Sequence, residues 1–341
     1  MRGVILAAGK GTRMLPLTRH RPKPLVPVLD MPMIEHIIKG IVAAGVDELC
    51  VVVGYKAEMI REYLGDGERY GAQVVYCLQE DCGGTGDAVL RAEGFVGEQA
   101  FFLCWGDIMV APENYPAVVS RFAEGDCEGV VGANWIEDPY EGAAVYERAG
   151  YLERIVEKPP KGTASTHYNN AGIFVLTPQI FDALRQIPFS PRGELEVPSA
   201  LMAMVEAGRH LAIQGLAGYW NDVARPASVL KLQQIMLENL SSDGILIAEN
   251  AAISADARLD APVYIGPDAQ VGAAHLGPNA VVGRGCRIAD GCRLTETACF
   301  AGARCGAGAV AEYAILEENA QLPAGYELVG DEAAPACRHG R

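Results

Sequence analysis

Two glycines and two cationic residues near the start of the chain form the pattern with the clearest chemical meaning. Gly9 and Gly11 follow a short apolar strand at residues 4–6, and Arg13 and Lys23 come soon after. A turn without side chains lets consecutive backbone N–H groups face one anion, and the two cations add positive charge at the same place. The pattern therefore predicts a phosphate-binding loop.

The spacing of the glycines excludes two common phosphate loops. A Walker loop needs Gly-x-x-x-x-Gly-Lys-Ser/Thr, whereas this chain reads Gly-Lys-Gly-Thr with no glycine at the required distance before it. The dinucleotide-binding fingerprint needs a third glycine at the place where Met14 stands.

An acidic residue follows another strand-like run. Asp107 comes directly after the apolar residues 101–105 and Gly106. A carboxylate at the end of a strand is well placed to hold Mg²⁺ with few protein ligands, because phosphates and water complete the coordination. We therefore predict that Asp107 is a magnesium ligand.

A sheet with alternating helices must position these residues. Apolar residues in 33–44 fall at helical spacing, and Gly45 ends that pattern. The expected buried strands are residues 2–8, 48–53, 72–77 and 100–105. This alternation predicts an α/β fold with a Rossmann-like, mostly parallel sheet and helices on both faces. Since the carboxyl ends of parallel strands share one edge, the glycine loop and Asp107 should meet in one cleft.

The last third of the chain follows a different pattern. A helix at residues 226–240 and a linker at 241–245 precede apolar residues that recur every six positions, each usually followed by a small residue. The recurring residues are Ile247, Ile253, Leu259, Ile265, Val271, Leu276, Val282, Ile288, Leu294 and Phe300. This hexapeptide period predicts a short left-handed parallel β-helix of a little over three coils across residues 246–330, with a disordered tail at 331–341.

The full N-terminal string resembles the signature of the sugar nucleotidyltransferases, the enzymes that make nucleoside-diphosphate sugars. The resemblance runs from Leu6 through Pro16-Leu17-Thr18 to Lys23-Pro24 and continues in ordered blocks across residues 1–225. It implies that residues 1–225 form the catalytic domain, in which a sugar 1-phosphate attacks the α-phosphorus of a nucleoside triphosphate with Mg²⁺ as cofactor. Close members are glucose-1-phosphate thymidylyltransferases and uridylyltransferases.

The resemblance assigns the triphosphate and the metal to named residues. Arg13 would hold the β- and γ-phosphates, and Lys23 would face the α-phosphate. Asp222, in the string Tyr219-Trp220-Asn221-Asp222-Val223, would join Asp107 as the second magnesium ligand. The nucleotide-binding set is Leu6, Ala8, Gly9, Gly11, Thr12, Arg13, Gln79, Gly84, Thr85 and Asp107.

The base and the sugar are assigned in the same way. The gap between Gln79 and Gly84 matches members that use UTP or dTTP, because a glutamine amide offers both a donor and an acceptor to a pyrimidine. The sugar-phosphate set is Gly142, Glu157, Lys158, Asn170 and Asp222, and Lys158 would hold the phosphate. Ala224 stands where the family usually has glycine. This difference keeps an unusual sugar or a cyclitol phosphate open as the substrate.

Composition bounds the partners and the compartment. The 341 residues include 28 basic and 43 acidic side chains, and this net charge of −15 disfavours nucleic acid and acidic membranes as partners. No apolar run approaches the roughly 20 residues of a membrane span. Because Met1 leads directly into an expected strand, we expect no signal peptide. Ten cysteines without a Cys-x-x-Cys pair indicate buried thiols in the cytoplasm; a zinc site or a disulfide framework is the alternative.

Several functions remain open beside a UTP- or dTTP-dependent enzyme acting on glucose 1-phosphate or its N-acetylamino relative. The nucleotide could be GTP, with a mannose-type or cyclitol 1-phosphate as acceptor. The β-helix could add acyltransferase activity through its single histidine, His275. A non-catalytic regulatory subunit is the third alternative. The open ends of a short β-helix also predict a homo-oligomer that assembles through it.

Overall fold

The computed structural model describes residues 1–81, 83–240 and 243–340, and the chain divides into two compact units. The first unit comprises Met1–Lys10, Pro22–Pro24 and Ile34–Asp222. The second comprises Gly11–Arg21, Leu25–Met33 and Val223–Arg341. Ser241 and Ser242 of the expected linker and Arg341 of the expected tail lie outside the described residues.

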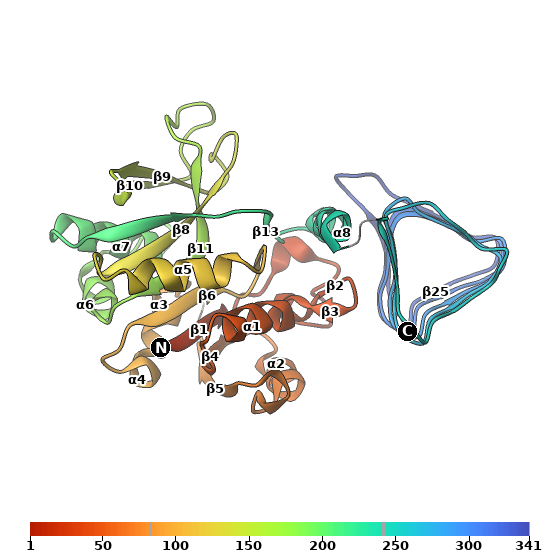
Figure 1. The fold of residues 1–341 in the computed structure, drawn as a ribbon, viewed down its shortest axis with the longest axis horizontal. Coiled ribbons are helices and arrows are strands. Elements are labelled where there is room, and N and C mark those ends of the chain that lie inside the picture. The colour runs from red at the N-terminus through yellow and green to blue at the C-terminus, as the bar shows by residue number, and fades with distance from the viewer. Residues whose placement is uncertain (82, 241–242, 341) are drawn as a thin grey trace. The chain divides into compact units, whose positions relative to one another are not determined.

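A nine-stranded sheet forms the centre of the first unit, in the order β5-β4-β1-β6-β11-β8-β12-β10-β9 (Figure 1). Its strands are β1 (Arg2–Ala7), β4 (Glu48–Val53), β5 (Gln73–Leu78), β6 (Phe101–Trp105), β8 (Gly129–Trp135), β9 (Ala143–Arg148), β10 (Tyr151–Glu157), β11 (Tyr168–Leu176) and β12 (Leu211–Gly215). The four expected strands are neighbours and run parallel, as predicted. Strand β11 then runs antiparallel to β6, so that the sheet as a whole is mixed.

Helices cover both faces of this sheet. They are α1 (Met33–Ala43), α2 (Ala57–Leu64), α3 (Gly84–Arg91), α4 (Glu93–Val96), α5 (Asn114–Ala123), α6 (Gln179–Gln186) and α7 (Val197–Glu206). Successive side chains of a strand point to opposite faces. Phe101 accordingly stacks on Phe181 of α6, while Phe102 packs against Tyr115 of α5. Both phenylalanines are fully buried, so the sheet is a rigid base for the loops at its carboxyl edge.

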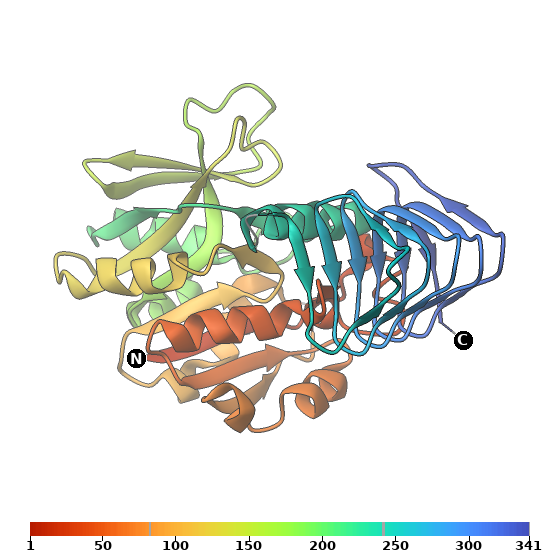
Figure 2. The same cartoon turned by 45° about the vertical axis from the view of Figure 1, so that its right-hand side comes forward.

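The second unit contains α8 (Pro226–Leu240) and a stack of coils with a triangular outline (Figure 1). Its strands are β14 (Ile245–Ile247), β15 (Ala252–Ile253), β16 (Arg258–Leu259), β17 (Val263–Ile265), β18 (Gln270–Val271), β19 (His275–Leu276), β20 (Ala280–Val282), β21 (Arg287–Ile288), β22 (Arg293–Cys299), β23 (Arg304–Cys305), β24 (Val310–Leu316), β25 (Gln321–Leu322), β26 (Glu327–Val329) and β27 (Ala336–Arg338). Each strand pairs in parallel with the equivalent strand of the next coil (Figure 2). The predicted parallel coils are therefore confirmed.

The stack is longer than predicted. One side of it is a five-stranded sheet, β15-β18-β21-β23-β25. The stack therefore has about five coils instead of a little over three, and the additional ones follow Phe300. Many inward positions of these coils hold small residues, such as Ala303, Cys305, Ala309 and Ala320, which are buried together with Leu316 and Leu322. The six-residue pattern of large aliphatic residues does not include these small residues, although small side chains also fill a narrow core.

The tail is also more ordered than predicted. Strand β27 pairs in parallel with β24, and Gly340 forms a bridge with Ala320. The expectation of a disordered segment at 331–341 is therefore wrong for these residues. Backbone hydrogen bonds to the last coil outweigh a composition that by itself suggests disorder.

Two further findings concern the whole described chain. The nine described cysteines are free thiols, and Cys286 and Cys292 lie buried inside the coils, where their Sγ atoms lie 3.0 Å from the Phe300 oxygen and 3.1 Å from the Gly306 oxygen. Within residues 1–81, 83–240 and 243–340, no helix has the length and apolar character needed to cross a bilayer.

Candidate active site

The loops that follow β1, β4, β5 and β6 touch one another at the carboxyl edge of the sheet. A side chain on Gly54 would place its Cβ 2.8 Å from the Ala8 oxygen and 3.0 Å from the Gln79 oxygen. A Cβ on Gly106 would lie 2.9 Å from the Leu6 oxygen. Both glycines are therefore needed for close approach of the backbones, and they join the predicted nucleotide loops into one surface.

The glycine loop itself has two different glycines. Gly11 has a φ of +61°, a left-handed conformation that favours glycine. Gly9 has no such φ, and among the described residues other than its chain neighbours no atom lies within 4 Å of a Cβ built on it. Gly9, Thr12 and Arg13 are exposed. The chain thus leaves open space at Gly9, which suits the approach of a ligand.

Leu6 and Ala8 hold this surface together through their backbone oxygens. The Leu6 oxygen accepts a hydrogen bond from Gly106 N at 2.8 Å, and the Ala8 oxygen accepts one from Tyr55 N at 3.1 Å. Tyr55 follows β4, so these bonds fix the loop after β1 between its two neighbours.

Lys23, Asp107 and Asp222 come together within the first unit. The Lys23 ammonium lies 2.7 Å from Asp107 Oδ2 and 3.5 Å from Asp222 Oδ1. The lysine side chain is 8% exposed, whereas the two aspartates are 37% and 39% exposed. A buried ammonium between two accessible carboxylates is favourable only because the opposite charges compensate each other.

A short antiparallel pair of strands explains how the two aspartates meet. Strand β7 (Ile108–Val110) follows Asp107 directly and pairs with β13 (Trp220–Asp222), where Ile108 lies opposite Asp222. This register brings Asp222 beside Asp107, although the two residues are far apart in the sequence.

This pair of carboxylates fits a magnesium ion. Oxygen ligands are the ones that Mg²⁺ prefers, and it is usually bound by one or two carboxylates while phosphates and water supply the rest. In the part of the chain that the structure describes, no group of three or more His, Cys, Asp or Glu side chains could hold a metal. Asp107 and Asp222 are the pair that could hold Mg²⁺ at this edge of the sheet.

The predicted base-binding residues are engaged with the chain itself. Gln79 Nε2 donates to the Gly84 oxygen at 3.0 Å and to Asp87 Oδ2 at 2.8 Å, so that the amide hydrogens of Gln79 are engaged within the chain. Thr85 Oγ1 accepts from Val197 N at 3.1 Å. A Cβ on Gly84 would lie 2.3 Å from the Leu195 oxygen, so close packing also requires this glycine.

Asn170 lies at an irregularity in β11, where the register with β8 shifts between Asn170 and Phe174. Asn170 Oδ1 accepts from Gly172 N at 3.1 Å, while its buried Nδ2 has no partner among the described residues. Gly172 has a φ of +70°, and a Cβ there would overlap the Trp105 ring. Trp220 Nε1 donates to the Ala171 oxygen at 3.0 Å. The bulge is thus fixed between two indoles, Trp105 at the end of β6 and Trp220 of β13.

The remaining sugar-phosphate residues form a group beside this bulge. Lys158 N donates to the Gly142 oxygen at 2.8 Å, and Lys158 has a φ of +44°. Asn169 Oδ1 accepts from Ala143 N at 3.0 Å and would overlap a Cβ on Gly142. Desolvation raises the pKa of the Glu157 carboxyl; Lys158 and Arg192 oppose this rise, and Glu196 adds to it.

The structure therefore joins the predicted residues of the first unit through shared contacts, whereas Gly11, Thr12 and Arg13 belong to the second unit. Sequence reasoning missed three supporting residues. Asp87 fixes the Gln79 amide, Trp105 packs on the bulge, and Asn169 holds the Gly142 turn. Asp87 and Asn169 had a signal, because each is a polar residue close to a predicted site residue.

Comparison with known proteins gives a consistent result. The sequence profile of the family described as "Nucleotidyl transferase" matches residues 2–239. The chain is 32% identical over 271 residues to the low-salt glycan biosynthesis nucleotidyltransferase Agl11 of Haloferax volcanii, which covers 79% of this chain and 74% of that protein. It is 28% identical to a glucose-1-phosphate thymidylyltransferase of Streptomyces antibioticus, over 84% of each chain.

Other relatives match over part of their length. The bifunctional protein GlmU of Methanococcus maripaludis is 35% identical over 71% of this chain, but the match spans only 56% of GlmU. Among solved structures, a proposed glucose-1-phosphate thymidylyltransferase of Bacillus anthracis in complex with sucrose superposes with a TM-score of 0.63 and 26% identity. It covers 68% of this chain and 94% of that one.

Proposed function

Because the chain belongs to the nucleotidyl transferase family and is a sugar-phosphate nucleotidyltransferase, we propose that it joins UTP or dTTP to a sugar 1-phosphate. The proposed acceptor is glucose 1-phosphate or its N-acetylamino relative. The observation that carries the proposal is the meeting of Asp107 and Asp222 around the Lys23 ammonium, at the edge where the glycine loop ends β1.

In the proposed reaction, a phosphate oxygen of the sugar 1-phosphate attacks the α-phosphorus. A new oxygen–phosphorus bond forms, the bond to the bridging oxygen of the β-phosphate breaks, and pyrophosphate leaves with the electron pair. The protein contributes mainly position and charge. Arg13 would hold the β- and γ-phosphates, Lys23 the α-phosphate and Lys158 the sugar phosphate. Mg²⁺, held by Asp107 and Asp222, would neutralise the negative charge of the triphosphate.

The nucleotide preference rests on Gln79. Because both of its amide hydrogens are bound to Gly84 and Asp87, the Gln79 Oε1 atom can accept from the N3–H of uracil or thymine. Guanine also carries N–H donors, so GTP with a mannose-type or cyclitol 1-phosphate stays the second candidate. Ala224, in place of the family's usual glycine, is the sequence feature that keeps an unusual sugar or a cyclitol phosphate open as the acceptor.

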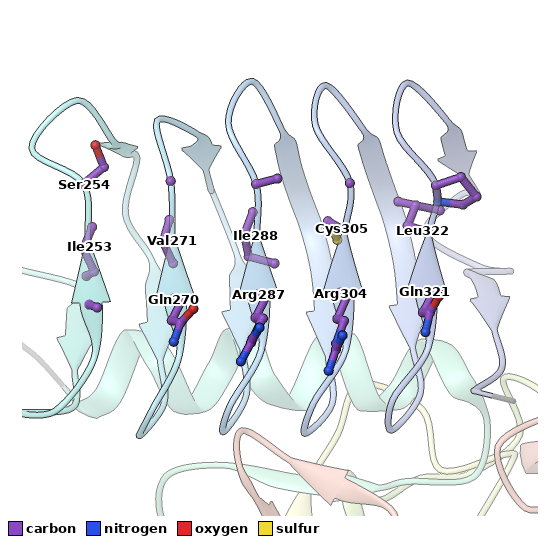
Figure 3. Close-up of a pocket in the computed structure, with 15 residues that line it drawn as sticks. Ile253, Ser254, Gln270, Val271, Arg287, Ile288, Arg304, Cys305, Gln321 and Leu322 are labelled. Atoms are coloured by element: carbon purple, nitrogen blue, oxygen red, sulfur yellow. The ribbon is translucent and has the colours of Figure 1, made fainter.

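Acyl transfer on the coils has less support. His275 Nε2 lies 2.6 Å from Asp260 Oδ2, an arrangement that can orient a basic imidazole. A cavity of about 840 Å³ lies along the sheet β15-β18-β21-β23-β25 (Figure 3), and His275 is not among the residues that line it. A purely regulatory role is disfavoured because the chain keeps Arg13, Lys23, Asp107, Lys158 and Asp222.

The same cavity supports the proposed homo-oligomer. Its centre carries Arg287 and Arg304, which are exposed neighbours on paired strands between Gln270 and Gln321 (Figure 3). Like charges on paired strands repel each other, which destabilises this face when no partner supplies opposite charges. A second copy of this acidic chain could supply carboxylates to both. We propose assembly through this face in the cytoplasm, and light scattering of Arg287→Glu/Arg304→Glu should report a smaller particle.

Pyrophosphate release tests the reaction directly. The protein is incubated with Mg²⁺, each of five nucleoside triphosphates and a panel of sugar 1-phosphates. We expect release with UTP or dTTP. Asp107→Asn and Arg13→Ala should keep the fold but lose activity by roughly 100-fold or more. Release with GTP alone would favour the second candidate, and full activity of Asp107→Asn would exclude the metal assignment.

A further inference from the structure

Both proposed phosphate-binding cations lie on one segment, residues 11–33, that is shared between the two units. Pro22–Pro24, with Lys23, belongs to the first unit. The stretches on either side, Gly11–Arg21 and Leu25–Met33, belong to the second unit, together with the coils. The segment that carries Arg13 is therefore packed with the coils, although the two are about 300 residues apart in the chain.

The first anchor of this segment is Arg21. Its guanidinium pairs with both carboxylate oxygens of Glu318 and lies 3.2 Å from Glu317 Oε2. Arg21 also lies over the Phe300 ring, 5.7 Å from its centroid. A bidentate pair fixes the orientation of both partners, which a single-point contact does not.

Burial strengthens this anchor. The Glu317 side chain is 4% exposed and that of Arg21 is 12% exposed. The tail completes the enclosure, because Glu317 N donates to the Arg338 oxygen and His339 Nδ1 lies 2.5 Å from Glu317 Oε1. Loss of Arg21 would leave a buried carboxylate without its main counter-charge.

A second anchor lies on the other side of Lys23. Asp30 Oδ1 accepts from Arg284 N at 2.8 Å, and the Arg284 guanidinium lies 3.7 Å from Asp30 Oδ2. The Asp30 side chain is 12% exposed. The two anchors are contributed by different coils and hold both ends of the loop that contains Lys23.

We propose that Arg21, Glu317 and Glu318 are positioning residues for the phosphate-binding segment, so that the coils set the position of Arg13 during the reaction. This inference rests on the proposed function, in which Arg13 and Lys23 act on the triphosphate. The coils then have a role within a single chain, besides the proposed assembly of copies.

The test compares Arg21→Gln, Arg21→Lys, Glu317→Gln and Asp30→Asn with the control Arg148→Gln, whose ion pair with Glu153 lies on the surface of the first unit. Hydrogen exchange of residues 9–24 is measured in each protein, together with kcat and both KM values. We expect Arg21→Gln to speed exchange in residues 11–21 and to lower kcat roughly 10- to 100-fold. KM for the sugar 1-phosphate should stay unchanged, and Arg21→Lys should recover part of kcat.

The outcomes separate this inference from the proposed function. If no pyrophosphate is released by the unaltered protein, the proposed function fails, and hydrogen exchange still decides whether Arg21 holds the segment. Unchanged exchange in Arg21→Gln, or faster exchange with unchanged kcat, would overturn the inference. If Arg21→Gln does not fold, the milder Asp30→Asn must show the same change in residues 25–33 and in kcat.

Discussion

At the scale of single residues, the glycines of the site differ in why the fold requires a residue without a side chain. Gly11 and Gly172 need a left-handed backbone, and Gly54 and Gly106 allow close approach of neighbouring loops. Gly9 has neither reason, because its φ is ordinary and the space around it is open. A glycine that the fold does not require points to a ligand that approaches the backbone.

Gly9→Ala should therefore separate binding from stability. We expect the free energy of unfolding to change by less than about 0.5 kcal/mol, because the added Cβ has no atom of another described residue within 4 Å apart from its chain neighbours. Nucleotide affinity should fall by about tenfold or more, measured by titration calorimetry with the Mg²⁺–nucleotide complex. Gly94→Ala, which also has open space and lies on α4, is the matched control and should retain full affinity. Equal affinity in the two variants would contradict the ligand explanation.

Glu157 gives the reaction a pH dependence. Desolvation raises the pKa of this carboxyl, so it takes up a proton at a higher pH than an ordinary glutamate. A protonated Glu157 no longer accepts hydrogen bonds through a full carboxylate. As the pH falls from 7 toward 5, KM for the sugar 1-phosphate should rise more in the unaltered protein than in Glu157→Gln. Glu153→Gln, on the same strand, should keep the original profile; identical profiles for all three proteins would refute this role.

At the scale of elements, the stability of the coils depends on the residues that point inward, which alternate along each strand with residues that point outward. Leu294 on β22 is fully buried within the cluster that fills the coils, whereas its neighbour Arg293 points outward and is exposed. Each coil contacts mainly the coils beside it, so that a lost side chain is not compensated by distant parts of the chain. Close packing in a narrow core makes such losses costly.

Leu294→Ala should lower the free energy of unfolding by about 2–5 kcal/mol, because it removes transfer free energy and leaves a cavity. Arg293→Ala on the same strand should change it by less than about 0.5 kcal/mol. Urea unfolding followed by circular dichroism measures both. A loss below about 1 kcal/mol for Leu294→Ala would mean that the coils repack around the missing side chain.

At the scale of the whole molecule, ligand binding and stability are linked. A complex that binds only the folded state adds about 2.7 kcal/mol of apparent stability at 100 times its Kd. The melting temperature should therefore rise with the concentration of Mg²⁺ and nucleotide together. In Asp107→Asn, the part of this rise that requires Mg²⁺ should disappear, while Asp182→Asn, at an exposed side chain on α6, should behave as the unaltered protein. A full Mg²⁺-dependent rise in Asp107→Asn would place the metal elsewhere.

The sequence by itself determined the local elements and the family. Short apolar runs located β1, β4, β5 and β6 to within two residues, and apolar residues at helical spacing located α1 equally well. A starting proline followed by residues rich in Leu, Gln and Met located α8. The six-residue period predicted the coils, because burial of one face requires a fixed spacing of apolar side chains. The glycine loop with Arg13 and Lys23 indicated phosphate chemistry, because few side-chain types can bind a polyanion.

Only the tertiary structure decided which distant residues meet. The β7–β13 register places Asp222 beside Asp107, and the Arg21–Glu317 and Asp30–Arg284 contacts join residues 11–21 and 25–33 to the coils. No local pattern encodes these contacts, because each depends on strand pairing or charge pairing between segments far apart in sequence. The ordered tail escaped prediction likewise, since hydrogen bonds to the preceding coil stabilise it more than its own composition does.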